Sequence, residues 1–217
     1  MCIKTRRIRI FLFESVQFGY ASCLLFCFFF FNNFVYAREN KKEQANILWS
    51  IQRINELNDE EKESIVKSAN NILKKRIDVI TDKDFMFVND THYYVSVAPY
   101  WWPDTLQNGR IEFVRKDGQT NPNKLVNDWE KLHALAKSLK TLSIAYYLTD
   151  CDIYYTQYQN YIEKWFVSEE TKMYPNFEYA QLIPGRNGNR GRPTGIIEGY
   201  VFNDILESFR LINTKKK

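Results

Sequence analysis

Apolar residues recur at helical spacing in five segments, at about residues 42–57, 59–80, 128–148, 152–166 and from 195 onward. In the third segment, Leu132, Leu135, Leu139 and Leu142 fall on one face of a helix, as expected where that face packs on a core. Asp59 can cap the second helix, because its carboxylate accepts hydrogen bonds from free backbone N–H groups. The pattern therefore predicts an all-α fold with apolar stripes forming the core.

Two long segments, at about residues 81–124 and 168–194, lack this periodicity. Loops of such length are uncommon in a compact domain unless they bind a ligand or take part in catalysis. A short hairpin is expected around Asn108-Gly109, since Asn-Gly suits a tight turn. We expect a helical scaffold that carries its functional residues on these loops.

The first loop contains an unusual aromatic run, in which Pro99 and Pro103 flank Tyr100, Trp101 and Trp102. Each proline fixes its φ angle and lacks an N–H donor, so the run cannot continue a helix. It reads as a stiff loop that presents flat rings, which match the apolar faces of sugar rings. The alternative is a loop plugged into the core, because tryptophan is often largely buried.

The second loop offers cations, amides and further rings, namely Arg186, Arg190, Arg192, Asn176, Gln181, Tyr174 and Tyr179. A guanidinium group binds a carboxylate through paired donors, and side-chain amides can bind hydroxyl groups. Together with the aromatic run, this composition indicates an acidic saccharide as partner. The alternative is a solvated basic loop without a ligand.

The first 37 residues are typical of a secretory signal. A basic start is followed by an apolar stretch over residues 20–31 and by Val35-Tyr36-Ala37, an acceptable cleavage site. The apolar stretch is short for a membrane span, although an uncleaved anchor is the alternative. We expect residues 38–217 to form one domain, periplasmic or secreted, without stable membrane association once residues 1–37 are removed.

Removing residues 1–37 changes the charge, because they hold four of the 30 basic and one of the 26 acidic residues. The remainder is nearly neutral and has no basic stripe, which argues against a nucleic-acid partner. No sequence pattern for a metal or phosphate site is present, so we expect no metal and no cofactor. Of the two histidines, His92 lies in the first loop, and His133 reads as a structural residue within a helix.

An ordered series of short motifs spans residues 85–200. The series is His92-Tyr93-Tyr94-Val95-Ser96, Pro99-Tyr100-Trp101-Trp102-Pro103-Asp104, Arg115-Lys116-Asp117-Gly118, Asn121-Pro122, Ala145-Tyr146-Tyr147-Leu148-Thr149, Trp165-Phe166, Pro175-Asn176, Tyr179-Ala180-Gln181, Ile183-Pro184-Gly185, Gly191-Arg192 and Gly195-Ile196-Ile197-Glu198. In this order and spacing, the chain resembles the alginate lyase superfamily of bacterial polysaccharide lyases.

The resemblance implies an α/α toroid, an incomplete or complete barrel of antiparallel helix hairpins with long functional loops around a cleft. It also implies cleavage of uronate polymers, such as alginate or glucuronan, by β-elimination. In such a site Gln181 and Arg192 would contact the substrate, and Tyr100, Trp101 and Trp102 would be sugar platforms. Asn176 and Tyr179 complete the expected substrate-binding set.

The sequence also departs from the family pattern. The expected Asn-Asn-His motif and a catalytic tyrosine would lie beyond Lys217. Trp129 stands where the family pattern has a basic residue. We therefore expect the truncated amino-terminal part of such a toroid, weakly active or inactive alone, with its catalytic residues unknown. The alternatives are a remnant that binds acidic glycans without cleaving them and a structural helical protein.

Overall fold

The computed structural model describes residues 51–83, 87–123, 126 and 128–215. The predicted signal over residues 1–37 and most of the first expected helix lie outside this part of the chain. Of that helix, residues 51–55 are described and are helical.

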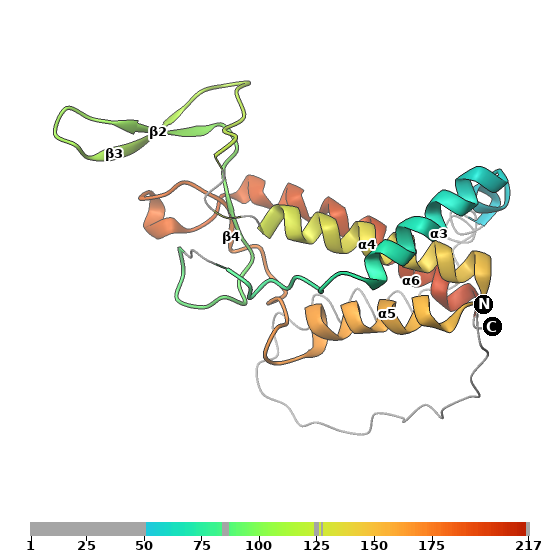
Figure 1. Ribbon diagram of the computed structural model, residues 1–217. Helices are drawn as coiled ribbons and strands as arrows, with labels where there is room; N and C mark the ends of the chain where they lie inside the picture. The colour runs from blue at the N-terminus through green and yellow to red at the C-terminus, as the bar shows by residue number, and fades with distance from the viewer. Residues whose placement is uncertain (1–50, 84–86, 124–125, 127, 216–217) are drawn as a thin grey trace, which may run out of the picture.

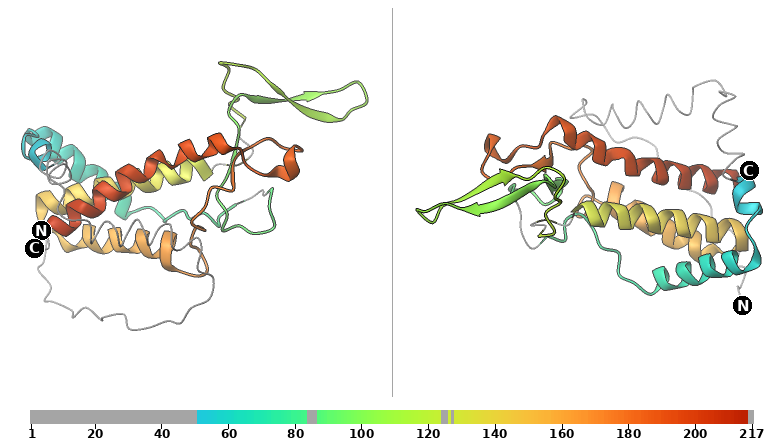
Figure 2. Two further views of the ribbon diagram at one scale, coloured as in Figure 1. Left: turned by 180° about the vertical axis from the view of Figure 1, so that it is seen from behind. Right: turned by 90° about the horizontal axis from the view of Figure 1, so that it is seen from above.

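Four α-helices form the main body of the described chain. The helical elements are α3 (Asp59–Leu73), α4 (Asp128–Thr149), α5 (Asp152–Ile162), the π-helical turn η1 (Glu163–Val167), the short 3-10 helices η2 (Asn187–Asn189) and η3 (Pro193–Val201), and α6 (Phe202–Lys215). Helix α4 lies in the middle and contacts α3, α5 and α6 (Figures 1 and 2). The apolar face predicted for it is buried in the core.

The N-cap and the last residue of helix α3 differ from those predicted. Asn58 is its N-cap, and the Asn58 and Glu61 side chains each accept a hydrogen bond from the other's backbone N–H at 2.9 Å. This reciprocal capping box satisfies the backbone N–H groups of both Asn58 and Glu61, whereas a single capping side chain at Asp59 would not form this pair of bonds. The helix ends at Leu73, and the buried residues Ile77 and Ile80 belong to an irregular segment instead.

The expectation of an all-α toroid is wrong, because the chain also forms two small sheets. Strand β1 (Val95–Val97) pairs in parallel with β4 (Tyr179–Leu182), and β2 (Trp101–Thr105) pairs antiparallel with β3 (Ile111–Arg115). The β2–β3 hairpin turns at the predicted Asn-Gly. Strand β1 reads Val-Ser-Val, and three residues are too few for this alternation to stand out as a strand signal.

Pro103 lies within β2, where the sequence had indicated a loop. Backbone hydrogen bonds from Lys116 N to Tyr100 O (2.8 Å) and from Leu106 N to Arg110 O (2.9 Å) bracket the ladder. By the alternation of an antiparallel pair, residue 103 then falls where an N–H would point away from β3. A proline is tolerated there because no ladder bond is lost.

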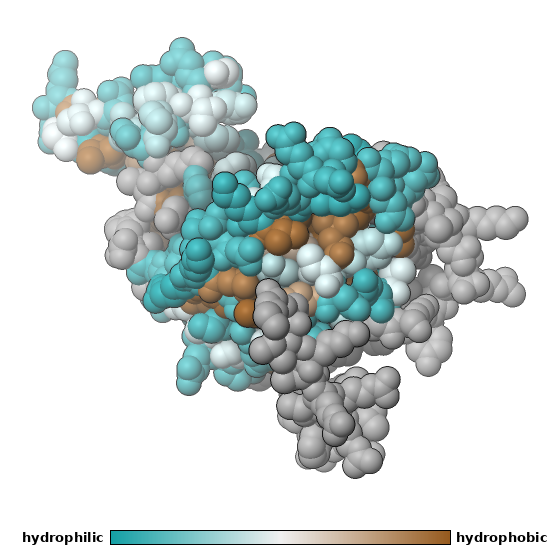
Figure 3. Space-filling view, turned by 45° about the vertical axis from the view of Figure 1, so that its right-hand side comes forward, coloured by the Kyte–Doolittle hydropathy of each residue, from teal (hydrophilic) through white to brown (hydrophobic). Residues whose placement is uncertain are grey.

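Both sheets lie at the end of the helical body where α4 begins, and the β2–β3 hairpin projects away from it (Figure 1). On the face shown in Figure 3, hydrophilic residues surround a group of apolar residues. Within the described ranges, no helix combines the length and the apolar character that a membrane span requires.

Candidate functional site

The parallel pair β1–β4 brings the two predicted functional loops together. Val95 is paired with Tyr179 and Val97 with Leu182, so β4 contains one residue more than β1 over this stretch. Ala98 N then donates to Leu182 O at 2.9 Å. The aromatic run of the first loop therefore begins beside the end of β4.

Gln181 lies in this irregular part of β4 and has a left-handed backbone, with φ of 53°. Its N–H donates to Ser96 Oγ at 2.8 Å, and its side-chain Oε1 accepts from Thr194 Oγ1 at 3.1 Å. Non-glycine residues in this conformation are uncommon and are often found at binding or catalytic sites. Because its oxygen is bound to Thr194, the side chain has its NH₂ group left to donate.

Gly191 and Gly195 allow the segment over residues 191–195 to lie directly against β4. A Cβ added at Gly191 or Gly195 would come within 2.5 Å of Ala180 O. Gly191 N donates to Glu178 O at 2.8 Å and Arg192 N to Ala180 O at 3.0 Å. Arg192 is thereby held beside Gln181.

Replacing Gly195 by alanine is expected to lower the free energy of unfolding by about 1–3 kcal/mol, because the added methyl group meets backbone that cannot move aside. Gly199→Ala is the matched control, since its Cβ would meet only the Phe177 ring at 3.5 Å, an ordinary contact. Urea denaturation measures both. Equal stability of the two variants would contradict this account of the close packing on β4.

The three arginines of the second loop differ in their partners. The Arg186 guanidinium lies 4.5 Å from the Trp101 ring centroid and donates to Phe113 O at 3.1 Å. Arg190 pairs with Glu178 at 3.5 Å. No hydrogen bond or ion pair joins the Arg192 side chain to any residue that the structure describes. Arg192 is therefore the cation of this loop that is left for a ligand.

The aromatic run is not plugged into the core. Tyr100 is 41% exposed, and Trp101 and Trp102 are half-buried on the hairpin. Successive side chains of a strand point to opposite faces, so Trp101 lies on the face that Arg186 covers and Trp102 on the other. Trp102 Nε1 donates to Gln119 O at 2.9 Å, and Lys116 lies over its ring. The structure thus joins Trp101, but not Trp102, to the second loop.

Asn176 and Tyr179 lie in local contacts of the second loop. Asn176 Oδ1 accepts from Glu178 N at 3.1 Å, which commits its carbonyl to a turn. The Tyr179 ring lies edge-on to Tyr93, with ring centroids 4.9 Å apart, and Tyr93 contacts Tyr174 in the same manner. These contacts order the rings next to β4 and leave the Asn176 NH₂ group as a donor.

His92 joins the two loops through contacts at both ring nitrogens. Its Nδ1 lies 2.7 Å from Asp90 Oδ1, and its Nε2 lies 3.1 Å from Glu169 O. Tyr174 stacks on the imidazole and donates to Asp90 Oδ2 at 2.9 Å. Partial burial alone would raise the pKa of Asp90, but the hydrogen bonds from His92 and Tyr174 hold this pKa below its ordinary value.

His133, predicted to be a structural residue, has hydrogen-bond contacts at both ring nitrogens. Its Nδ1 lies 2.8 Å from Trp129 O, and because a carbonyl only accepts, Nδ1 carries the proton. Its Nε2 lies 2.7 Å from the hydroxyl oxygen of Tyr200. Tyr200 is 58% exposed. The i, i+4 spacing of Trp129 and His133 was visible in the sequence, but the partner Tyr200 was not.

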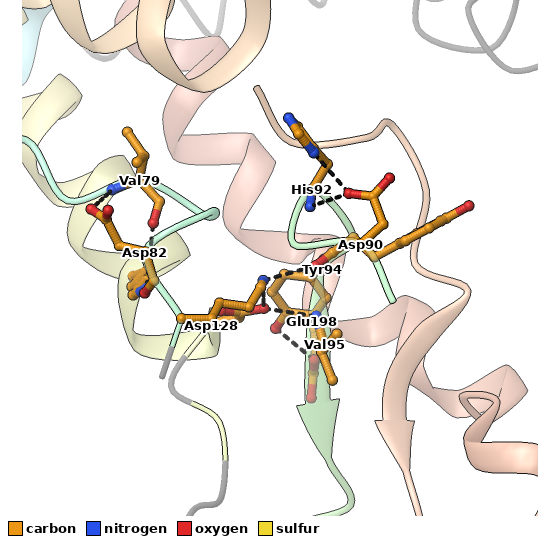
Figure 4. Close-up of polar contacts among 11 residues, drawn as sticks. Val79, Asp82, Asp90, His92, Tyr94, Val95, Asp128 and Glu198 are labelled. Carbon is orange, nitrogen blue, oxygen red and sulfur yellow. Dashed lines mark hydrogen bonds and ion pairs between the residues drawn. The ribbon is translucent and has the colours of Figure 1, made fainter. Parts of the chain in front are cut away.

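Two buried carboxylates support the site, and sequence reasoning missed both. Asp128 begins α4, pairs with Lys83 and accepts from Val95 N at 2.9 Å. Glu198, from η3, accepts from the Tyr94 hydroxyl at 2.7 Å. Both carboxylates meet the chain at the start of β1 (Figure 4). They fix the strand against which β4, and with it Gln181, is aligned.

The family model described as alginate lyase matches residues 87–217. The chain belongs to the alginate lyase family. The matched range contains every residue proposed from the sequence as substrate-binding, together with both buried carboxylates.

A crystal structure of an alginate lyase from Bacteroides ovatus is similar to this family member, with 34% sequence identity and a TM-score of 0.65. The similarity covers 70% of this chain and 40% of that chain. This chain thus spans less than half the length of that relative. No curated protein matches the chain.

Proposed function

We propose that this chain carries a substrate-binding surface of a polysaccharide lyase that acts on uronate polymers by β-elimination. The observation that carries the proposal is the position of Arg192, whose N–H donates to the O atom of Ala180, the residue next to Gln181 in the sequence, and whose side chain makes no hydrogen bond or ion pair among the described residues. A guanidinium group can bind the two oxygens of a uronate carboxylate together. The Gln181 amide can donate to the same carboxylate or to a hydroxyl group.

The chemistry of β-elimination explains why such donors are needed. The reaction removes the C5 proton next to the carboxylate, forms the C4–C5 double bond and expels the O4 glycosidic oxygen, which takes up a proton. Negative charge develops on the carboxylate as the C5 proton leaves. Donors held in place before the reaction stabilise that charge without reorganising, which is the role we propose for Arg192 and Gln181.

Aromatic side chains support a saccharide ligand. Tyr100 is exposed at the start of the hairpin, and Trp101 is linked to the second loop through Arg186. Flat rings of this kind can pack on the apolar faces of sugar rings. We propose that they bind sugar units next to the one held by Arg192.

A second function, binding of acidic glycans without cleavage, is favoured by one observation. The sequence contains no Asn-Asn-His motif, which the resemblance makes the expected source of the neutralising amide and imidazole. On this view the isolated chain retains glycan binding and has little or no turnover.

One experiment tests both functions. The chain is mixed with polyglucuronate or alginate, and with a neutral glucan as control, while binding is followed by calorimetry and unsaturated product by ultraviolet absorbance. We expect binding of a uronate polymer with little or no product. Robust product formation would show that the chain is itself a lyase and overturn the binding-only function, whereas neither binding nor product would contradict both.

A further inference from the structure

The buried carboxylate of Glu198 has no role in the contacts proposed above for the substrate. Glu198 is only 7% exposed and belongs to η3, whereas its two partners lie in β1 and directly before it. Glu198 Oε2 accepts from Tyr94 OH at 2.7 Å and from Ser96 Oγ at 2.6 Å. A buried carboxylate is costly unless it is well hydrogen-bonded, and here two hydroxyl groups converge on one oxygen.

The donor roles in this group follow from the chemistry of each partner. Burial, and next the Glu198 charge, raise the pKa of Tyr94 far above its ordinary value, so its hydroxyl remains a donor. Ser96 Oγ donates a hydrogen bond to Glu198 and accepts one from Gln181 N at 2.8 Å. A continuous chain of hydrogen bonds therefore leads from the Glu198 carboxylate through Ser96 to the backbone of residue 181. Hydrogen bonds to a charged acceptor are stronger than neutral ones, and bonds in such a chain strengthen one another.

The chain of hydrogen bonds ends at the one residue of β4 whose backbone is left-handed. Gln181 adopts φ of 53°, which a residue with a side chain keeps only when its surroundings hold it there. The N–H of such an irregular residue is not satisfied by the regular ladder, and Ser96 supplies its acceptor instead. Thr194 then orients the Gln181 side chain by donating to Oε1.

We propose that Ser96, oriented by the buried Glu198 carboxylate, is a positioning residue that holds Gln181 in the conformation that presents its NH₂ group to the ligand beside Arg192. The local contacts stand on their own, and the effect on the ligand rests on the proposed uronate-binding function. If this hydrogen-bonded group only stabilised the fold, loss of either hydroxyl donor to Glu198 would have the same effect on Gln181. On the proposal, only loss of the Ser96 hydroxyl affects Gln181, because of the two donors only Ser96 is hydrogen-bonded to it.

Two variants, each of which removes one of the two hydroxyl groups that donate to Glu198, separate these possibilities. Ser96→Ala breaks the connection to Gln181, whereas Tyr94→Phe removes a donor to the same oxygen and leaves that connection in place. The first measurement is amide hydrogen exchange at residue 181, followed by NMR on the folded full chain. We expect exchange about tenfold faster in Ser96→Ala and little changed in Tyr94→Phe.

The second measurement is the affinity for a glucuronate oligosaccharide, with thermal unfolding recorded as a check on folding. We expect Ser96→Ala to weaken binding about five- to tenfold, the loss of roughly one hydrogen bond, and Tyr94→Phe to bind like the unaltered chain. Equal amide exchange in the two variants would overturn the proposed connection. Faster exchange without weaker binding in Ser96→Ala would overturn the positioning role.

An Arg192→Ala variant measured in parallel distinguishes failure of the proposed uronate-binding function from failure of the positioning role. If Arg192→Ala weakens binding and Ser96→Ala does not, the proposed function stands and the positioning role of Ser96 is wrong. If neither variant changes binding, the proposed function fails, and the role of Ser96 toward the ligand fails with it. In that case the exchange result alone decides whether Ser96 holds the Gln181 backbone.

Discussion

Replacing Asp128 by asparagine is expected to lower the free energy of unfolding by about 3–5 kcal/mol, because it leaves the buried Lys83 charge without a counter-ion. Both side chains are almost completely buried, at 1% exposure for Lys83 and 0% for Asp128. Burial lowers the pKa of Lys83 and raises the pKa of Asp128, while their mutual attraction opposes both shifts. Lys83 Nζ also donates to Tyr93 O at 2.8 Å, so the pair ties the first loop to α4.

The matched control is the double variant Lys83→Met with Asp128→Asn. It removes both charges but keeps an amide oxygen that can accept from Val95 N. Replacing both partners of a buried pair is often nearly neutral, so we expect the double variant to recover most of the lost stability. Urea unfolding followed by circular dichroism measures all three proteins. A single variant as stable as the unaltered chain would show that the ion pair does not hold this end of the fold.

Replacing Arg192 by alanine is expected to weaken binding of a uronate oligosaccharide by about ten- to a hundredfold. A hydrogen bond to a charged group contributes about 1.5–3 kcal/mol, and Arg192 is the second-loop arginine whose side chain makes no hydrogen bond or ion pair with a described residue. Arg192→Lys is expected to recover only part of the affinity, because an ammonium group cannot make the paired contacts of a guanidinium group.

Arg190→Ala is the control for the Arg192 variants. It removes the same charge from the same loop, but Arg190 already pairs with Glu178. Isothermal titration with a glucuronate oligosaccharide at constant salt gives the three affinities, and salt is held constant because exposed charges are screened. Similar losses for Arg190→Ala and Arg192→Ala would indicate a diffuse electrostatic effect and contradict a specific contact at Arg192.

The sequence predicted the long helices well and the strands poorly, for a physical reason. Helices α4 and α5 carry apolar stripes over several turns, and a periodic signal of that length is hard to mistake. Strands β1 and β4 have three and four residues, too few to show alternation. Pro103 argued against a strand at β2, because proline lacks an N–H. The sequence could not show that the N–H of residue 103 would point away from β3, where its absence costs no hydrogen bond.

The candidate site could be predicted only in part. Residue type and resemblance were enough to propose Gln181 and Arg192, since amides and guanidinium groups suit an acidic sugar. Glu198 and Ser96 are 102 residues apart in the chain, and no local pattern connects them. The partners of Arg186 and Arg190 also depend on the folded chain, so the sequence could not single out Arg192 as the uncommitted cation.

The most direct measurement of the central claim is an NMR titration of the chain with a glucuronate oligosaccharide and, separately, with its carboxyl-reduced form. We expect the acidic oligosaccharide to shift the amide signals of Gln181 and Arg192, and the reduced form, with the same rings and no charge, to leave them unchanged. Equal shifts with both sugars, or shifts confined to residues far from β4, would contradict it.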